Sequence, residues 1–157
     1  MKSKCFPLVS LTLLALAGLA AADPGAEHHV LSGAGAVKWG PPPAVFPAGA
    51  QFALIDGDPA AKGLVTVRLK MPAGYKIAPH WHPTDEHVTV LSGEFSIGMG
   101  DTLDTSKGVK LHAGGYGVAP ANMHHYAWTN TGATVQVHMI APFALTYVNP
   151  ADDPSNK

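Results

Sequence analysis

Turn-forming residues interrupt this chain at short intervals from residue 51 onwards, and that spacing is its strongest constraint on the fold. Clusters of Gly, Pro, Asn, Asp and Ser recur at 56–59, 72–74, 92–93, 100–101, 114–115 and 130–132. The segments between them are too short for packed helices, whereas strands of roughly four to eight residues fit. The 17 glycines and 14 prolines among 157 residues agree with many tight turns. We therefore expect a β-sheet protein.

Alternation of apolar and polar side chains marks the strands. In segment 64–71 every second residue is apolar and faces one side, with Thr66, Arg68 and Lys70 facing the other. Further strands are predicted at 86–91, 94–99, 109–112, 117–119, 126–129 and 134–140, with a closing strand and a polar tail within 143–157. Only 101–107 has the pattern of a short helical turn. Many short strands without a long helix favour a β-sandwich or a β-barrel.

The N-terminus has the three-part layout of a secretory signal peptide. Lys2 and Lys4 precede an apolar run over 6–19, and three alanines at 20–22 follow it. A transmembrane anchor is the alternative, but Pro, Ser and Thr interrupt the run, which is also short for a span. We expect cleavage after Ala22, a periplasmic or secreted protein, and no stable membrane anchor.

Removal of residues 1–22 changes the charge and the chemistry of the chain. It takes away two lysines and no acid, so the formal net charge moves from -1 to -3. Such a balance does not attract nucleic acid or an anionic membrane. The single cysteine, Cys5, is also lost. A bound metal would therefore need ligands from His, Asp or Glu.

The stretch HWHPTDEH at 80–87 concentrates potential metal ligands. Prolines on both sides exclude a helix, and on a strand His80 and His82 point to one face about 6.6 Å apart along the chain. Glu86 shares their parity, whereas Asp85 and His87 would face the other way, although a kink at Pro83-Thr84 would break strict parity. A second cluster follows at 120–125, PANMHH, and a histidine from this later strand would complete a site. The alternative is a polar turn without a ligand.

These residues resemble the two motifs of the cupin superfamily. Gly74, His80, His82, Glu86 and Gly93 reproduce the spacing of the first motif at each fixed position. In the second motif, the matching residues are Gly114, Pro120 and His125. Asn122 stands where that motif has glycine, a mild change because asparagine tolerates left-handed backbone. The motif's last asparagine has no counterpart, since Asn130 lies one position too late.

The resemblance implies an all-β fold, a double-stranded β-helix that forms a jelly-roll barrel, over residues 48–148. Residues 23–47 would be an irregular lead-in, with Val37, Trp39 and Phe46 as candidates to pack on the domain, and residues 149–157 a polar tail. By position the metal ligands are His80, His82, Glu86 and His125, with His125 selected over its neighbour His124. Three imidazoles and one carboxylate suit one divalent Fe, Mn, Ni, Cu or Zn ion and leave two open positions in an octahedron.

The function that this implies is a metal-dependent enzyme that acts on a small molecule, with dioxygenase-like oxidoreductase chemistry favoured. Glu86 would hold the metal and, when loosened, move a proton. A metal-assisted decarboxylase, lyase or isomerase needs the same ligands, and a non-catalytic protein that binds metal or a small ligand is a different class. His138 is either a hydrogen-bonded structural residue or a neighbour of the cavity. We expect a homodimer and no nucleic-acid partner.

Overall fold

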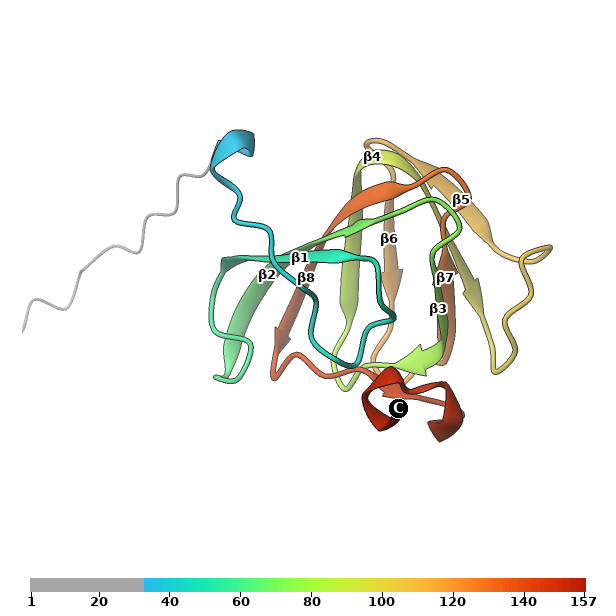
Figure 1. The fold of residues 1–157 in the computed structure, drawn as a ribbon. Coiled ribbons are helices and arrows are strands. Elements are labelled where there is room, and N and C mark those ends of the chain that lie inside the picture. Colours follow the sequence, from blue (N-terminus) through green and yellow to red (C-terminus); the bar gives the residue numbers. More distant parts are fainter. Residues whose placement is uncertain (1–32) are drawn as a thin grey trace, which may run out of the picture.

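A single long strand connects the two halves of the fold. The computed structural model describes residues 33–157, so the predicted signal peptide lies outside the described residues. Strand β4 (Glu86–Met99) pairs with β6 (Tyr116–Ala119) and β8 (Ala133–Ala141) through its first half. Its second half pairs with β5 (Val109–His112) and β7 (His125–Trp128). Every pairing is antiparallel, and β4 therefore belongs to both sides of the barrel (Figure 1).

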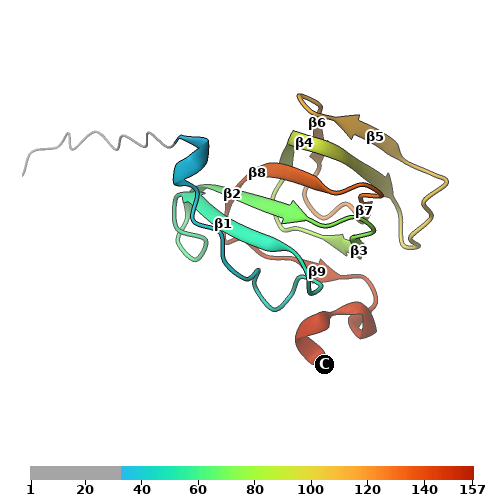
Figure 2. The ribbon, with the colours of Figure 1, turned by 45° about the horizontal axis from the view of Figure 1, so that its top comes forward.

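The remaining strands extend the sheet from both flanks of β4. On one flank, β8 is followed by β2 (Gly63–Met71) and β1 (Gln51–Asp56). On the other flank, β7 is followed by β3 (Lys76–Trp81) and β9 (Thr146–Tyr147). Figures 1 and 2 show these strands curling around a common interior, with the C-terminal 3₁₀ turns Pro150–Asp152 and Pro154–Asn156 beside one end. The expected all-β jelly-roll barrel is confirmed.

The separate strands predicted at 86–91 and 94–99 are wrong, because β4 runs through both. The register against β8 shifts between Val90 and Ser92, which marks a β-bulge. Gly93 has a φ of 77°, and a Cβ there would lie 2.1 Å from the carbonyl oxygen of Gly132. The Ser-Gly pair thus bends one strand from one side of the barrel to the other and does not reverse the chain.

The core fills the barrel interior as the alternation in 64–71 predicts. Val65, Val67 and Leu69 on β2 are buried and pack with the inward residues of β4 and β8. Thr66 faces outward but is also buried, because the imidazole of His138 lies within hydrogen-bond distance of its hydroxyl. Between residues 33 and 157, no helix has the length and apolar character needed to cross a bilayer.

Of two connecting segments, one differs from its prediction and the other agrees with it. Segment 101–107 is a turn without a helix, closed by the N–H of Lys107 donating to the carbonyl of Asp104. Part of the lead-in packs on the barrel: Gly40 forms an isolated bridge with Phe52, and Phe46 is only 7% exposed. The lead-in therefore contributes a side chain to the core.

Candidate metal centre

Three histidines from two neighbouring strands converge inside the barrel. His80 lies near the end of β3, His82 directly follows that strand, and His125 begins β7. His80 and His125 are direct partners in the β3–β7 ladder. One ring nitrogen of each histidine lies within 4.8 Å of the other two, and all three side chains are buried. This group of nitrogens could hold a metal ion.

Backbone carbonyls fix the orientation of all three rings. The Nδ1 atoms of His80, His82 and His125 lie 2.7, 2.6 and 2.9 Å from the carbonyl oxygens of Ala78, Ala144 and Met123, respectively. An Nδ1–H that donates to a carbonyl leaves the Nε2 lone pair free to bind a metal. In the described part of the chain, the Nε2 atoms of His82 and His125 are buried and have no hydrogen-bond partner.

Glu86, the first residue of β4, lies beside these nitrogens. Its carboxylate oxygens are 3.4 Å from Nε2 of His125 and 3.7 Å from Nε2 of His82, and the side chain is 15% exposed. Burial opposes ionisation of Glu86, but the contact with His125 and the nearby imidazoles lower the pKa of Glu86 to about 2. The three histidines and Glu86 thus form one buried cluster, with the carboxylate on the side of His82 and His125.

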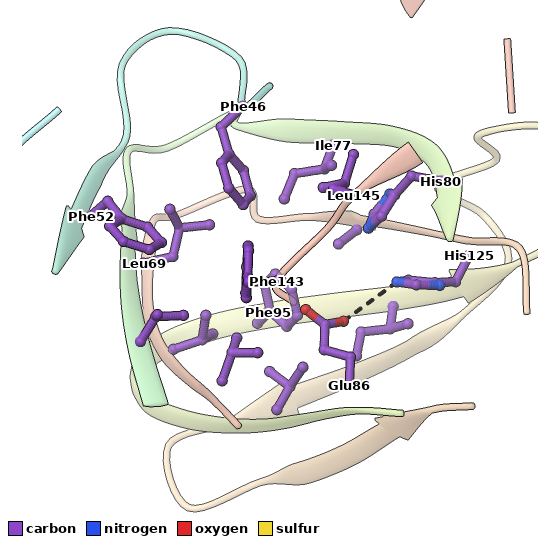
Figure 3. Close-up of a pocket in the computed structure, with 16 residues that line it drawn as sticks. Phe46, Phe52, Leu69, Ile77, His80, Glu86, Phe95, His125, Phe143 and Leu145 are labelled. Atoms are coloured by element: carbon purple, nitrogen blue, oxygen red, sulfur yellow. Dashed lines mark ion pairs between the residues drawn. The ribbon is translucent and has the colours of Figure 1, made fainter. Parts of the chain in front are cut away.

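The histidines differ in how readily they hold a proton. Burial lowers the pKa of His80 to about 3, and neighbouring His125 acts in the same direction. Burial also disfavours the charged form of His125, but the Glu86 carboxylate raises the pKa of His125 above its usual value. The dashed line in Figure 3 joins this pair, Nε2 of His125 and a Glu86 carboxylate oxygen, 3.4 Å apart.

Two hydrogen bonds join the loops that carry the ligands. The N–H of Asn122 donates to the carbonyl of His82 over 2.8 Å, and the N–H of Ala121 donates to Oδ1 of Asp85 over the same distance. Asn122 has a φ of 61°. The prediction that asparagine replaces the motif's glycine by adopting left-handed backbone is therefore confirmed. Asp85 lies in the segment between β3 and β4, where strand parity does not apply, and contacts the loop before β7.

The other histidines near the cluster point elsewhere. Nδ1 of His124 lies 2.6 Å from Oδ1 of Asp101 on the exposed surface. His87 contacts the hydroxyl of Tyr116, and His138 contacts Thr66 and Gln136. His138 is thus the hydrogen-bonded structural residue of the two alternatives. The structure brings His80, His82, Glu86 and His125 together and leaves His124, His87 and His138 outside.

Thr129 occupies the position where the second cupin motif has asparagine. Its hydroxyl accepts a hydrogen bond from the N–H of Gly132 over 3.0 Å, and the side chain is 1% exposed. Its backbone exchanges hydrogen bonds with Gly74 and Tyr75. Sequence reasoning missed this residue. A threonine at this position could have indicated the turn, because threonine, like asparagine, stabilises turns by accepting a backbone hydrogen bond with its side-chain oxygen.

The cluster forms one wall of a mainly apolar cavity. In the described chain, 13 of the 16 lining residues are apolar, and the other three are His80, Glu86 and His125. Figure 3 shows His80, His125 and Glu86 at one end, with Phe46 and Phe52 at the other. The volume of this cavity is about 30 Å³.

Comparison with known proteins identifies the family. The model of the ChrR cupin-like domain matches residues 27–142, and the chain belongs to this family. None of the curated proteins matches the chain.

Among solved structures, the polyketide cyclase RemF from Streptomyces resistomycificus is similar with a TM-score of 0.66, 15% identity, and coverage of 82% of this chain and 92% of RemF. A protein from Methylibium petroleiphilum PM1, assigned provisionally as an acetylacetone dioxygenase, is 26% identical with a TM-score of 0.58, over 75% of this chain and 79% of its own. The DMSP lyase DddQ from Ruegeria pomeroyi DSS-3 is 20% identical with a TM-score of 0.59, over 74% of this chain and 63% of its own. The neighbours under 25% identity support the fold alone.

Proposed function

We propose that this ChrR cupin-like protein holds one divalent transition-metal ion and acts on a small molecule as a metal-dependent enzyme. The observation that carries the proposal is the pair of buried Nε2 atoms without hydrogen-bond partners, on His82 and His125. A buried polar atom left without a partner costs about 1–3 kcal/mol, which a metal bond would remove. The carbonyl contacts of all three Nδ1 atoms support this use of Nε2.

The proposed ligands are His80, His82, Glu86 and His125. Three neutral imidazoles and one carboxylate leave a net charge near +1 on a divalent ion, and this mixed nitrogen and oxygen set suits Fe, Mn, Ni, Cu or Zn. When bound, such an ion supplies Lewis-acid and redox chemistry to a substrate with oxygen donors. A ligand nitrogen must be unprotonated, so the metal would bind the neutral form of His125.

Glu86 is the residue that we propose for proton transfer. Its carboxylate is the one acid among the described residues that line the cavity, and it lies 3.4 Å from Nε2 of His125. A carboxylate that loosens from the ion could take a proton from a substrate in the cavity and return it later. The apolar walls would exclude competing water from this step.

Dioxygenase-like oxidoreductase chemistry is the favoured reaction. The relative assigned provisionally as an acetylacetone dioxygenase supports it, as the one of the three neighbours above 25% identity. A decarboxylase, lyase or isomerase would need the same ligands. A non-catalytic protein that holds a metal or small ligand is the second candidate function, and the small, largely enclosed cavity favours it.

We also propose that residues 1–22 are a cleaved signal peptide that directs the protein to the periplasm or outside the cell. We propose separately that the protein forms a homodimer through the edges of its sheet. The N-terminal sequence of the secreted protein and its mass in solution test these two proposals.

Metal content tests the site. Protein purified from its secreted compartment should carry close to one equivalent of a transition metal by mass spectrometry, and His82→Ala should lose it. The matched control is His138→Ala, which removes a hydrogen-bonded histidine outside the cluster and should keep the metal. Unchanged metal content in His82→Ala would refute the ligand assignment. For protein that carries the metal, oxygen uptake with a β-diketone would support the enzyme, and no uptake would favour the non-catalytic binding protein.

A further inference from the structure

Strands β5 and β6 form one long free edge of the barrel. Both pair with β4, and neither has another strand partner among residues 33–157. The segment between them stays beside β4, because the N–H of Gly114 donates to the carbonyl of Val90 and the N–H of Val90 donates to the carbonyl of Gly115. Residues 109–119 therefore run along β4 as a single edge, which Figure 2 shows at the margin of the barrel.

The two ends of the strand order, β1 and β9, are less open. Gly40 of the lead-in pairs with Phe52 of β1 through two backbone hydrogen bonds of 2.9 Å. Strand β9 has only two residues, and the 3₁₀ turns Pro150–Asp152 and Pro154–Asn156 follow it. Edge 109–119 is therefore the main unpaired strand edge in the described part of the chain.

An apolar groove lies along this edge. Its volume is about 470 Å³, and β4, β5, β6 and Gly108 line it with apolar side chains, two glycines and the ring of Tyr116. Four of these side chains are well exposed: Met99 by 51%, Val109 by 65%, Tyr116 by 56% and Val118 by 37%. Native proteins usually protect a free strand edge with charge or cover it, and a contiguous exposed apolar patch marks an interaction site.

The charges beside the groove are neutralised within the chain. Lys110 is the one lysine, arginine or acid between residues 109 and 119, and its Nζ lies 3.0 Å from a carboxylate oxygen of Glu94. In the loop before β5, Nζ of Lys107 lies 3.2 Å from a carboxylate oxygen of Asp104. A strongly charged partner meets no excess of opposite charge on this edge, whereas two copies of the edge do not repel each other.

The size of the patch suits a contact between two copies. From their exposed fractions, the four side chains present roughly 400 Å² of surface, half of what each partner buries in an interface of standard size. The backbone of the edge and the rim of the groove can supply the rest. A two-fold axis brings the same patch of both copies together, so that apolar side chains cover one another and the two free edges can bond.

We propose that edge 109–119 and the groove beside it form the interface of a symmetric dimer, in which a second copy of this chain covers Met99, Val109, Tyr116 and Val118. This inference rests on the proposed homodimer and names the edge that forms it. It is independent of the proposed metal site, because none of the four proposed ligands lines the groove.

Charge placed on the edge tests the interface. Val109→Lys on β5 and Val118→Lys on β6 should each weaken the dimer about tenfold or more in analytical ultracentrifugation, because symmetry brings like charges together in an apolar contact. Urea unfolding checks that both variants are folded. The control is Leu64→Lys on β2, which should leave the dimer unchanged, since Leu64 is 58% exposed and lies outside the groove. Unchanged dimer affinity in both folded edge variants overturns the inference.

Hydrogen exchange locates the contact. Peptides that span residues 109–119 should exchange more slowly at concentrations above the dimer dissociation constant than below it, whereas peptides from β1 should not change. Protection at β1 or β9 in place of 109–119 overturns this edge and leaves the homodimer standing. A monomer at every concentration overturns both the edge and the homodimer. The metal site is decided separately, by metal content.

Discussion

Asp85 offers a way to separate positioning of the metal ligands from the ligands themselves. Its exposed carboxylate accepts a hydrogen bond from the N–H of Ala121 and so joins the loop after His82 to the loop before His125. Asp85→Ala removes this bond and leaves every proposed ligand unchanged. The neighbouring bond from Asn122 to the carbonyl of His82 remains.

The magnitude follows from the exposure of the contact. A hydrogen bond to a charged group contributes about 1.5–3 kcal/mol, but solvent at Asp85 screens it towards about 1 kcal/mol. If the bond holds the ligand loops together before metal binds, metal binding must restore that order in Asp85→Ala. We then expect metal affinity to fall about fivefold, because 1 kcal/mol corresponds to roughly that factor in an equilibrium constant.

The assay is competition for Zn²⁺ against a chelating dye, together with urea unfolding of the metal-free protein. The matched control is Asp104→Ala, which removes a carboxylate that accepts from the N–H of Ser106 in an exposed turn away from the ligands. Asp104→Ala should keep its zinc affinity. An Asp85→Ala variant that loses stability but binds zinc as tightly as the unchanged protein would refute the positioning role.

Two further substitutions test the backbone conformations that shape the barrel. Asn122→Gly should keep or slightly raise the free energy of unfolding, whereas Asn122→Val should lower it by about 1–2 kcal/mol, because a β-branched residue resists the φ of 61° found there. Urea unfolding measures the free energy of unfolding of both variants. Equal values would contradict the idea that the backbone at position 122 strains a β-branched residue. Gly93→Ala should lower the free energy of unfolding by about 3 kcal/mol or more, since the added Cβ would lie 2.1 Å from the carbonyl oxygen of Gly132. Gly33→Ala, with nothing within 4 Å of the added atom, is the control, and a similar small effect in both would show that the bulge can relax.

The sequence predicts those parts of the fold that depend on neighbouring residues. Alternation placed β2 and β8 within one residue of their observed ends, and the strand at 109–112 matches β5. The pattern cannot distinguish a turn from a bulge at Ser92 and Gly93, because both use glycine with positive φ. The difference is set by the distant carbonyl of Gly132, which only the folded chain brings close.

The candidate site also combines features that the local sequence predicts with features that depend on distant residues. Spacing predicts that His80 and His82 share a face, and the family pattern adds His125. Glu86 begins another strand, β4, so the fold and not strand parity brings its carboxylate to the histidines. The apolar side chain of Phe46 predicts that it packs on the domain, and it is buried. Its place at the end of the cavity could not be predicted, since the lead-in has no strand periodicity. Its position depends on tyrosines from β9 and from the turn before β3, which bond to the backbone on either side of it. Long-range hydrogen bonds to backbone carbonyls leave no trace in the local sequence.

Strand parity also explains why adjacent residues of one short stretch have unrelated roles. Glu86 and His87 are neighbours on β4, so their side chains leave the sheet on opposite faces. Glu86 reaches the buried histidines, while His87 pairs across the sheet with His138, which in turn lies opposite Thr66. That outer row is held by hydrogen bonds with Thr66, Gln136 and Tyr116. A shift of β4 by one residue would exchange the two faces and bring His87 inside in place of the carboxylate. The β-bulge lies beyond Val90, so Glu86–Thr89 keep a regular ladder with β6 and His87–Val90 keep one with β8.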